Sequence, residues 1–382
     1  MKIYRADGVP IKLWCSFPEL EALNQLENLA RLPFTYRHVS LMPDGHTGYG
    51  MPIGGVVATT GTVIPNAVGL DIGCGVQVIQ TPYKVGAIDL KEIVGKIRET
   101  IPVGHKHNDT DQPKKLMPDM IAHSGIAVCE REYSSALRQL GTLGGGNHFI
   151  EIQKDKDDNI WVMLHSGSRN LGKKVAEHYI GIANYLNKKW YFSVGVDHDL
   201  SFLPIDCPEG QDYVREMKYC IDFAYANRTL MMDKILSIFD CSYIQRYDVA
   251  HNYARMENHF GKNVMVHRKG AIFARVGEIG IIPGSQGTKS YIVYGKGNPE
   301  SFESCSHGAG RAMSRTKAKA TLSLEEEIKK MEDKGILHGM RTKKNLEEAD
   351  EAYKSIDVVM EEQKDLVDIH IELRPLAVIK EN

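Results

Sequence analysis

Four of the fifteen histidines stand beside glycine, asparagine or serine in otherwise apolar stretches. They are His148 in GGGNHFIE, His165 in VMLHSGSRN, His251 in VAHNYAR and His307 in SCSHGAGR. Glycine-rich flanks allow the backbone to approach a ligand closely and leave N–H groups free for an anion. One histidine in such a setting is more often a hydrogen-bonded core residue. Four in the same kind of setting indicate a shared site.

Cys74 lies in GLDIGCGV, three residues after Asp71. Most free cysteines are small buried hydrophobic residues. In a loop at a strand end, however, this spacing can direct a carboxylate and a thiolate at one point, and a thiolate can bridge two cations. We therefore interpret five residues as a compact dinuclear metal site: Asp71, Cys74, His148, His165 and His251. The softness of sulfur and imidazole, taken alone, suits zinc.

A further pair, Asp44 and His46 in MPDGHTGYG, has two interpretations. The pair could line the same site, or Asp44 could stabilise a turn beside a surface histidine. The local sequence supports both equally.

Two other stretches have the composition of phosphate-binding loops, although the chain contains no GxxxxGK[ST] motif and no GxGxxG after a strand. The run IIPGSQGTKSY resembles an anion-binding nest with Lys289 close by. The run SHGAGRAMSRTKAK surrounds His307 with hydroxyl groups, glycines and basic residues. Together they indicate a polyphosphate or nucleic-acid ligand.

Composition places the chain among globular enzymes. Its 382 residues include 47 basic and 49 acidic side chains, and this near-neutral balance neither supports nor excludes a nucleic-acid partner. Seven cysteines without a CxxC pair favour a reducing compartment over a disulfide framework. No signal-peptide h-region and no run of 18 apolar residues occurs, so we predict a cytoplasmic protein with no membrane partner.

The elements that must position these residues are mixed. Apolar periodicity predicts helices over residues 16–32, 89–100, 115–140, 171–190, 208–239 and 346–364, and a helix capped by Ser323 with Glu326. Glycine-punctuated Val/Ile runs predict short buried strands over 39–81 and strand and loop over 264–311, with a last strand at the C-terminus. Because helices and strands do not alternate regularly, we predict one α+β domain over residues 1–382 with a sandwich or barrel-like core.

At this point the chain resembles a known family, the RtcB RNA ligases. The resemblance extends from about Val39 to the C-terminus and rests on motifs in the family's order: MPDGHTGYGMPIGG, GLDIGCGV, GGGNHFIE, LHSGSRN, AHNYA, IIPGSQGT, CSHGAGRAMSR and RPLAVIKE. It implies the family's own α+β fold, a central β-sandwich core surrounded by helices. It also implies two Mn²⁺ ions per active site, one held by Cys74, His148 and His165. The second would be held by Asp71, Cys74 and His251, with the thiolate bridging.

The resemblance further implies GTP as cofactor and His307 as the nucleophile that forms a histidine–GMP adduct. The guanylate would be held by a set of residues around that histidine: Asn147, Phe149, Glu151, Ser285, His307, Gly308, Gly310 and Lys380. Arg169 and Arg311 match arginines that contact RNA or nucleotide phosphates. The partners would be RNA with a 3′-phosphate or 2′,3′-cyclic phosphate end and RNA with a 5′-hydroxyl end, with room for an activating helper protein.

Two features depart from the family's pattern. Gln286 stands where the loop usually has methionine, and Glu381-Asn382 follow Lys380 where many members stop at a glycine. Both leave nucleotide preference and the choice between RNA repair and tRNA splicing open. The main rival function is a metal-dependent phosphoesterase that hydrolyses cyclic phosphates without ligation. It would use the same ligands but has no need of His307. A non-catalytic RNA-binding protein with the same fold is a second rival.

Overall fold

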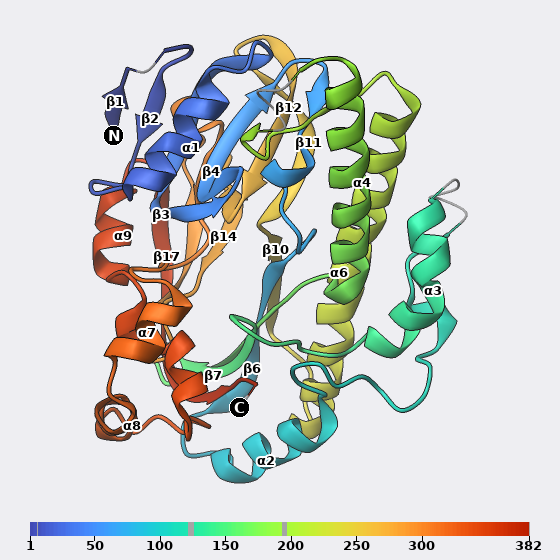
Figure 1. Cartoon of the computed structure of the whole chain (residues 1–382). Coiled ribbons are helices and arrows are strands. Elements are labelled where there is room, and N and C mark those ends of the chain that lie inside the picture. Colours follow the sequence, from blue (N-terminus) through green and yellow to red (C-terminus); the bar gives the residue numbers. More distant parts are fainter. Residues whose placement is uncertain (6, 121–125, 193–196, 382) are drawn as a thin grey trace.

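The computed structural model describes residues 1–5, 7–120, 126–192 and 197–381 (Figure 1). Two sheets form its centre. The six-stranded sheet has the order β1 (Lys2–Tyr4), β2 (Ile11–Leu13), β3 (Thr35–Tyr49), β4 (Met51–Thr59), β12 (Lys262–Lys269) and β11 (Asn252–His259). The seven-stranded sheet has the order β10 (Gln245–Ala250), β6 (Gly75–Lys84), β8 (Asn159–Ser166), β7 (Phe149–Lys154), β17 (Val367–Ile379), β15 (Ser290–Gly295) and β14 (Ile279–Ile282).

The two sheets share a buried apolar core. Val56 and Val266 of the first sheet belong to the same cluster as Ile282, Tyr291 and Val293 of the second. Two small antiparallel pairs complete the β structure: β13 (Ala271–Phe273) with β16 (Ser304–Ser306), and β5 (Thr62–Val63) with β9 (Leu203–Pro204). The predicted α+β class with a β-sandwich core is confirmed.

Helices surround this core (Figure 1). The α-helices are α1 (Leu20–Ala30), α2 (Leu90–Thr100), α3 (Ala127–Gln139), α4 (Arg169–Lys189), α6 (Pro208–Phe239), α7 (Arg315–Thr321), α8 (Leu324–Asp333) and α9 (Ile356–Glu362). Short 3₁₀ turns are η1 (Pro65–Ala67), η2 (Lys114–Leu116), η3 (Pro299–Ser301), η4 (Lys343–Glu348) and η5 (Asp350–Ala352). In the part of the chain that the structure describes, no helix has the length and apolar character needed to cross a bilayer.

The longest helix, α6, follows directly from its sequence. Pro208 occupies its first turn, where a missing N–H costs nothing, and Cys207 caps it by accepting the N–H of Gly210. It ends at Asp240, which adopts the left-handed conformation with φ 52°. One face of α6 is buried against α3 and α4 in a single apolar cluster, and Phe223 at its centre has no exposed surface. The predicted range 208–239 is confirmed.

Other predicted elements differ in their bounds. The helix predicted over 16–32 begins only at Leu20, because Glu19 is in extended conformation. Of the range 115–140, residues 127–139 are helical, while residues 121–125 lie outside the described part. The predicted short strands over 39–81 include one of 15 residues, β3, whose pairing with β4 is interrupted by register shifts. Ser323 caps α8 by accepting the N–H of Glu326, as predicted.

The helix predicted over 346–364 is wrong. The structure has η4, η5 and the short helix α9 there instead. Glu348 and Tyr353 hydrogen-bond to each other within this segment. Residues five apart in an α-helix point about 140° away from each other, at 3.6 residues per turn. A continuous helix would therefore separate these two side chains.

Candidate active site

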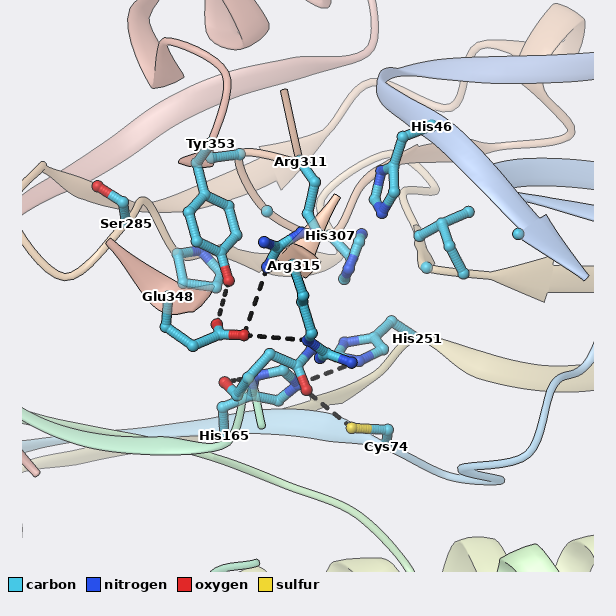
Figure 2. A pocket seen from close by; sticks show the side chains of 18 of the residues that line it. His46, Cys74, His165, His251, Ser285, His307, Arg311, Arg315, Glu348 and Tyr353 are labelled. Atoms are coloured by element: carbon cyan, nitrogen blue, oxygen red, sulfur yellow. Dashed lines mark hydrogen bonds and ion pairs between the residues drawn. The ribbon is translucent and has the colours of Figure 1, made fainter. Parts of the chain in front are cut away.

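A pocket of about 470 Å³ brings together residues from all parts of the chain (Figure 2). Two groups of side chains face it. The first, the metal corner, consists of the five predicted ligands Asp71, Cys74, His148, His165 and His251, of which all but His148 line the pocket. The second, the nucleotide wall, consists of Arg311, Arg315, Glu348, Tyr353 and Lys380. His307 lies between them, with its ring centroid 4.7 Å from that of His251.

Strand pairing assembles the metal corner. Cys74 immediately precedes β6, and His165 lies near the end of β8, which pairs with β6 in antiparallel register. His148 immediately precedes β7, the other neighbour of β8, where Phe149 is opposite His165. His251 follows β10, the neighbour of β6, and its N–H donates to the carbonyl of Cys74 at 2.8 Å. Four strand ends at one edge of the sheet thus carry one donor each.

The donor atoms converge. Cys74 Sγ lies 3.2 Å from His165 Nε2 and 3.4 Å from His148 Nε2. Cys74, His148 and His165 form a buried group whose ligand atoms all lie within 4.8 Å of one another. Asp71 Oδ2 is 3.0 Å from His148 Nε2, and His251 Nε2 is 3.3 Å from His165 Nε2. The structure therefore places all five predicted ligands together.

Backbone carbonyls orient two of the imidazoles. His148 Nδ1 donates to the carbonyl of Leu143 at 2.9 Å, and His165 Nδ1 donates to that of Asn147 at 3.2 Å. These bonds assign the proton to Nδ1 and leave Nε2 as a lone-pair donor, as in protein metal sites. Burial lowers the pKa of His165 well below its usual value, so this ring is neutral.

The remaining donors also fit a divalent cation. Burial lowers the pKa of His251 well below its usual value, so its ring is neutral as well. Burial, together with the Asp71 carboxylate, raises the pKa of the Cys74 thiol. The Oδ1 atom of Asp71 is buried and has no hydrogen-bond partner among the described residues. Neutral imidazoles, a thiol beside a carboxylate and an unsatisfied oxygen are the chemistry of a transition-metal site.

His307 is held by Asp44. The Asp44 carboxylate is fully buried, and its Oδ2 accepts the backbone N–H of His307 at 3.1 Å and its Nδ1–H at 2.7 Å. This carboxylate determines the tautomer and directs Nε2 of His307 away from itself. Of the two interpretations of the Asp44–His46 pair, the structure supports the one in which it belongs to the site. His46 lines the pocket, and burial lowers its pKa to about 4.

A single carboxylate organises the nucleotide wall. Glu348 is 7% exposed and accepts from Arg311 Nη1 at 3.3 Å, Arg315 Nε at 3.4 Å and Lys380 Nζ at 3.3 Å. It also accepts the hydroxyl of Tyr353. Figure 2 shows dashed lines that join the Glu348 carboxylate to Tyr353 and to both arginines. Three cations concentrated at one wall of a pocket attract anions, and the shared carboxylate keeps them in place.

All eight residues predicted to hold the guanylate line the same pocket, and so does Arg311, one of the two predicted phosphate contacts: Asn147, Phe149, Glu151, Ser285, His307, Gly308, Gly310, Lys380 and Arg311. Lys380 lies 5.8 Å from the ring centroid of Phe149. Burial raises the pKa of Glu151 to about 8, against the lowering effect of Gln153 and Lys380. Ser285 donates to Asp350 and so attaches its loop to η5. Gln286 also lines the pocket, and its amide donates to the carbonyl of Glu348 at 2.8 Å.

Arg169 differs from Arg311. It does not line the pocket, and its guanidinium donates to the carbonyl of Gly104 at 3.0 Å and to Thr142 Oγ1 at 3.1 Å. Burial lowers the pKa of Arg169, and the charges of Asp71, Cys74 and Glu381 oppose this shift. Glu381 also forms an ion pair with Lys344. Asn382 lies outside the described residues.

Sequence reasoning missed Glu348 and Tyr353, and it included Arg315 only as one of several basic residues of a candidate phosphate-binding stretch. Glu348 and Tyr353 lie in the segment that apolar periodicity predicted to be a regular helix, and nothing in that pattern indicated that they face a pocket. The signal that could have found Arg315 was the basic stretch after His307, which indicated phosphate binding without separating one basic residue from another. Asp44 was considered, but nothing in its local sequence pointed to a histidine 263 positions away.

Comparison with known proteins adds to this geometry. The model of the family described as "tRNA-splicing ligase RtcB" matches residues 25–136 and 119–381. "RNA-splicing ligase RtcB" from Escherichia coli (strain K12) is 38% identical, and the alignment covers 99% of this chain and 99% of that protein. "tRNA-splicing ligase RtcB" from Nanoarchaeum equitans is 34% identical over 98% of this chain and 95% of the relative. The protein of the same name from Thermococcus kodakarensis is 32% identical over 94% and 90%.

The fold and the pocket define an α+β protein with a Cys/His donor set beside an Asp-held histidine. Together with the family match over nearly the whole chain, they show that this chain belongs to the RtcB family.

Proposed function

We propose that this protein is a GTP- and Mn²⁺-dependent RNA ligase that joins RNA 3′-phosphate or 2′,3′-cyclic phosphate ends to 5′-hydroxyl ends. The observation that carries this proposal is the Asp44–His307 pair beside the metal corner in one pocket. Hydrolysis by a metal site alone requires no such nucleophile. The curated relatives, which are named as RNA-splicing and tRNA-splicing ligases, support the same reaction class.

The metal corner would hold two Mn²⁺ ions, one on Cys74, His148 and His165 and one on Asp71, Cys74 and His251. The donor set by itself suits zinc equally well, so the choice of manganese rests on the family. When bound, the ions would neutralise charge on the phosphates and orient them.

The first step assigned to this chain is guanylylation of His307. Its Nε2 lone pair attacks the α-phosphorus of GTP, a P–N bond forms, the bond from the α-phosphorus to the bridging oxygen breaks, and pyrophosphate leaves. Asp44 holds the Nδ1 proton and stabilises the positive charge that develops on the ring. This is the role that a buried carboxylate has behind a catalytic imidazole.

The nucleotide wall and the residues near it would hold the guanylate. The ring of Phe149 and the ring of Tyr353 are apolar surfaces on which a base can stack, and Glu151 and Ser285 offer polar atoms at the same pocket. Arg311 and Lys380 supply positive charge toward the phosphates.

In the following steps GMP is transferred from His307 to the RNA 3′-phosphate, so the P–N bond breaks and a phosphoanhydride forms. The 5′-hydroxyl oxygen of the second strand then attacks the activated 3′-phosphorus and loses its proton to solvent. The bond from that phosphorus to the bridging oxygen breaks, and GMP leaves with this oxygen. A 2′,3′-cyclic end is first opened by water at the same site. Splitting one condensation into covalent steps is the usual advantage of nucleophilic catalysis.

Incubation with α-labelled GTP and each divalent metal in turn tests the proposal. The ligase becomes covalently labelled, most strongly with Mn²⁺, and His307→Ala does not. The rival phosphoesterase hydrolyses a 2′,3′-cyclic phosphate without acquiring label. An unlabelled protein that still opens cyclic ends would replace the ligase proposal with the phosphoesterase.

A further inference from the structure

Two adjacent side chains of α6, Asn227 and Arg228, lie directly behind the metal corner. They are 0% and 1% exposed, and neither lines the pocket. Buried amides and guanidinium groups are costly unless every polar atom finds a partner. The partners of this pair, which we call the α6 clamp, are therefore informative.

Arg228 bonds to three strand ends that carry ligands. Its Nη1 donates to the carbonyl of Gly73 at 2.9 Å and to that of Ser166 at 3.0 Å. Gly73 immediately precedes Cys74, and Ser166 immediately follows His165. The Nε and Nη2 atoms of Arg228 donate to the two carboxylate oxygens of Asp248, at 2.8 and 2.6 Å. Asp248 lies in β10, three residues before His251.

Asn227 is linked by hydrogen bonds to the segment that orients the fourth predicted ligand, His148. Its Oδ1 accepts the N–H groups of Gly141 at 2.7 Å and Thr142 at 3.1 Å, and its Nδ2 donates to the carbonyls of Thr142 and Gly167 and to Ser166 Oγ. The Ser166 hydroxyl in turn donates to the carbonyl of Leu143 at 2.7 Å. This is the same carbonyl that accepts Nδ1 of His148.

The glycines around Cys74 bring its loop close to the clamp. A Cβ on Gly75 would lie 2.5 Å from the carbonyl oxygen of Val249 and 3.1 Å from the guanidinium carbon of Arg228. A Cβ on Gly73, which has φ +74°, would lie 2.7 Å from the Cα of Ile221 in α6. Any larger residue at either position would push the Cys74 loop away from α6.

We propose that Asn227 and Arg228 are positioning residues that determine the spacing of Cys74, His148, His165 and His251, and with it the metal affinity of the site. This inference rests on the proposed metal role of the corner. A buried Arg–Asp pair that served only the fold could lie anywhere between α6 and β10. Here Nη1 of Arg228 donates to the carbonyls of the residues beside Cys74 and His165. The planar guanidinium has a fixed geometry, so it holds these two carbonyls at a fixed separation, which a flexible lysine side chain would not do.

The test compares Mn²⁺ binding to metal-free wild type and to clamp variants, without GTP or RNA. Arg228→Lys keeps the charge and the pairing with Asp248 but removes the planar fork. Arg228→Met combined with Asp248→Asn removes the whole ion pair, which avoids leaving an unpaired buried charge. Asn227→Ser removes the amide. The matched control is Arg246→Met with Asp233→Asn, because Arg246 and Asp233 form a 2.9 Å ion pair between the same two elements, β10 and α6. Among the described residues, the other hydrogen bonds of Arg246 go to Gln77 and to the carbonyl of Thr229, neither of which is adjacent to a predicted ligand.

We expect calorimetric titration to give a Kd for Mn²⁺ about 10- to 100-fold weaker in the clamp variants, the usual effect of changing the residues that support metal ligands. The Co²⁺-loaded variants should also lose intensity in the thiolate-to-cobalt absorption band, which reports ligand geometry directly. The control should stay within about twofold of wild type. Thermal unfolding of each metal-free variant establishes that it is folded. If the double variant does not fold, the Mn²⁺ affinity and the Co²⁺ spectrum of Arg228→Lys test the inference.

Wild-type affinity and an unchanged Co²⁺ spectrum in folded clamp variants would overturn the inference, as would an equal loss in the control. If the clamp variants weaken Mn²⁺ binding as expected but the wild-type protein is never covalently labelled by GTP, the proposed function is overturned and the positioning role of the clamp still holds.

Discussion

The metal corner and the nucleotide wall face each other across one pocket but are built differently. Four of the five predicted ligands of the corner lie at the ends of paired strands, and backbone hydrogen bonds between β6, β7, β8 and β10 bring them together. The wall is formed by the irregular segment that contains η4 and η5, by the start of α7 and by the end of β17. Side-chain contacts to Glu348 hold it together. The corner is therefore expected to be rigid before any ligand binds, whereas the wall depends on a balance of charges.

The largest expected effect is at the centre of the corner. Cys74→Ala should stay folded, because the strand pairing does not depend on the thiol, yet lose most bound Mn²⁺ and all ligation. Elemental analysis of the purified variant, together with its circular dichroism, checks both halves. Full metal occupancy in this variant would refute the assignment of Cys74 as a ligand.

His307→Ala should abolish the covalent GMP adduct and the joining of 3′-phosphate to 5′-hydroxyl ends, while metal content stays normal. Asp44→Asn should retain His307 but lower guanylylation by about 10²- to 10⁴-fold, since the tautomer is no longer determined. Gel assays with labelled GTP measure both.

A synthetic RNA with a preformed 3′-guanylate bypasses the missing step, so His307→Ala should still seal it. Failure to seal this RNA with full metal present would show that His307 acts beyond guanylylation.

The wall is expected to respond to loss of its C-terminal cation. Deleting residues 380–382 should abolish guanylylation without unfolding the protein, because Lys380 follows a strand, β17, that remains paired with β7 and β15. Deleting only residues 381–382 is the matched control and should keep most labelling. Equal labelling by both truncations would show that Lys380 does not contribute to nucleotide binding.

A smaller change is expected from Glu348→Gln, which keeps the shape of the wall but weakens its hold on three cations. We expect KM for GTP to rise about tenfold, which corresponds to about 1.4 kcal/mol, with kcat changing less. Steady-state labelling over a range of GTP concentrations separates the two parameters. A fall in kcat at constant KM would place Glu348 in the chemical step instead.

The last effect concerns pH and Glu151, and it is an effect on stability rather than on catalysis. Burial raises its pKa to about 8 from an ordinary 4.5, so between these values the folded protein holds a proton that the unfolded chain has released. The free energy of unfolding should then fall as pH rises through this window, by at most about 1.4 kcal/mol per pH unit. Glu151→Gln should lack this slope in denaturant titrations at several pH values. Parallel pH profiles for the two proteins would mean that Glu151 is ionised in the fold.

The two sides also differ in how far the sequence predicts them. All five corner residues could be named from their neighbours, because ligands at strand ends need glycine-rich turns and such turns leave a local signature. Glu348 and Tyr353 left none, since their periodicity is also that of a helix. Only the contacts made by their side chains reveal their role. The predicted sandwich core and α6 were confirmed because they too depend on patterns over a few neighbouring residues.

The sequence by itself determined the types of proposed donor, the histidine proposed as nucleophile and the strands and turns that carry them. These depend on residue type and on spacing over a few positions. The tertiary structure alone decided that Asp44 holds His307, that Glu348 binds three cations, and that Asn227 and Arg228 hydrogen-bond to the segments that carry four of the proposed ligands. Each of these is a contact between segments far apart in the chain, and hydrogen bonds of this kind are determined by the packing of sheets and helices rather than by neighbouring residues.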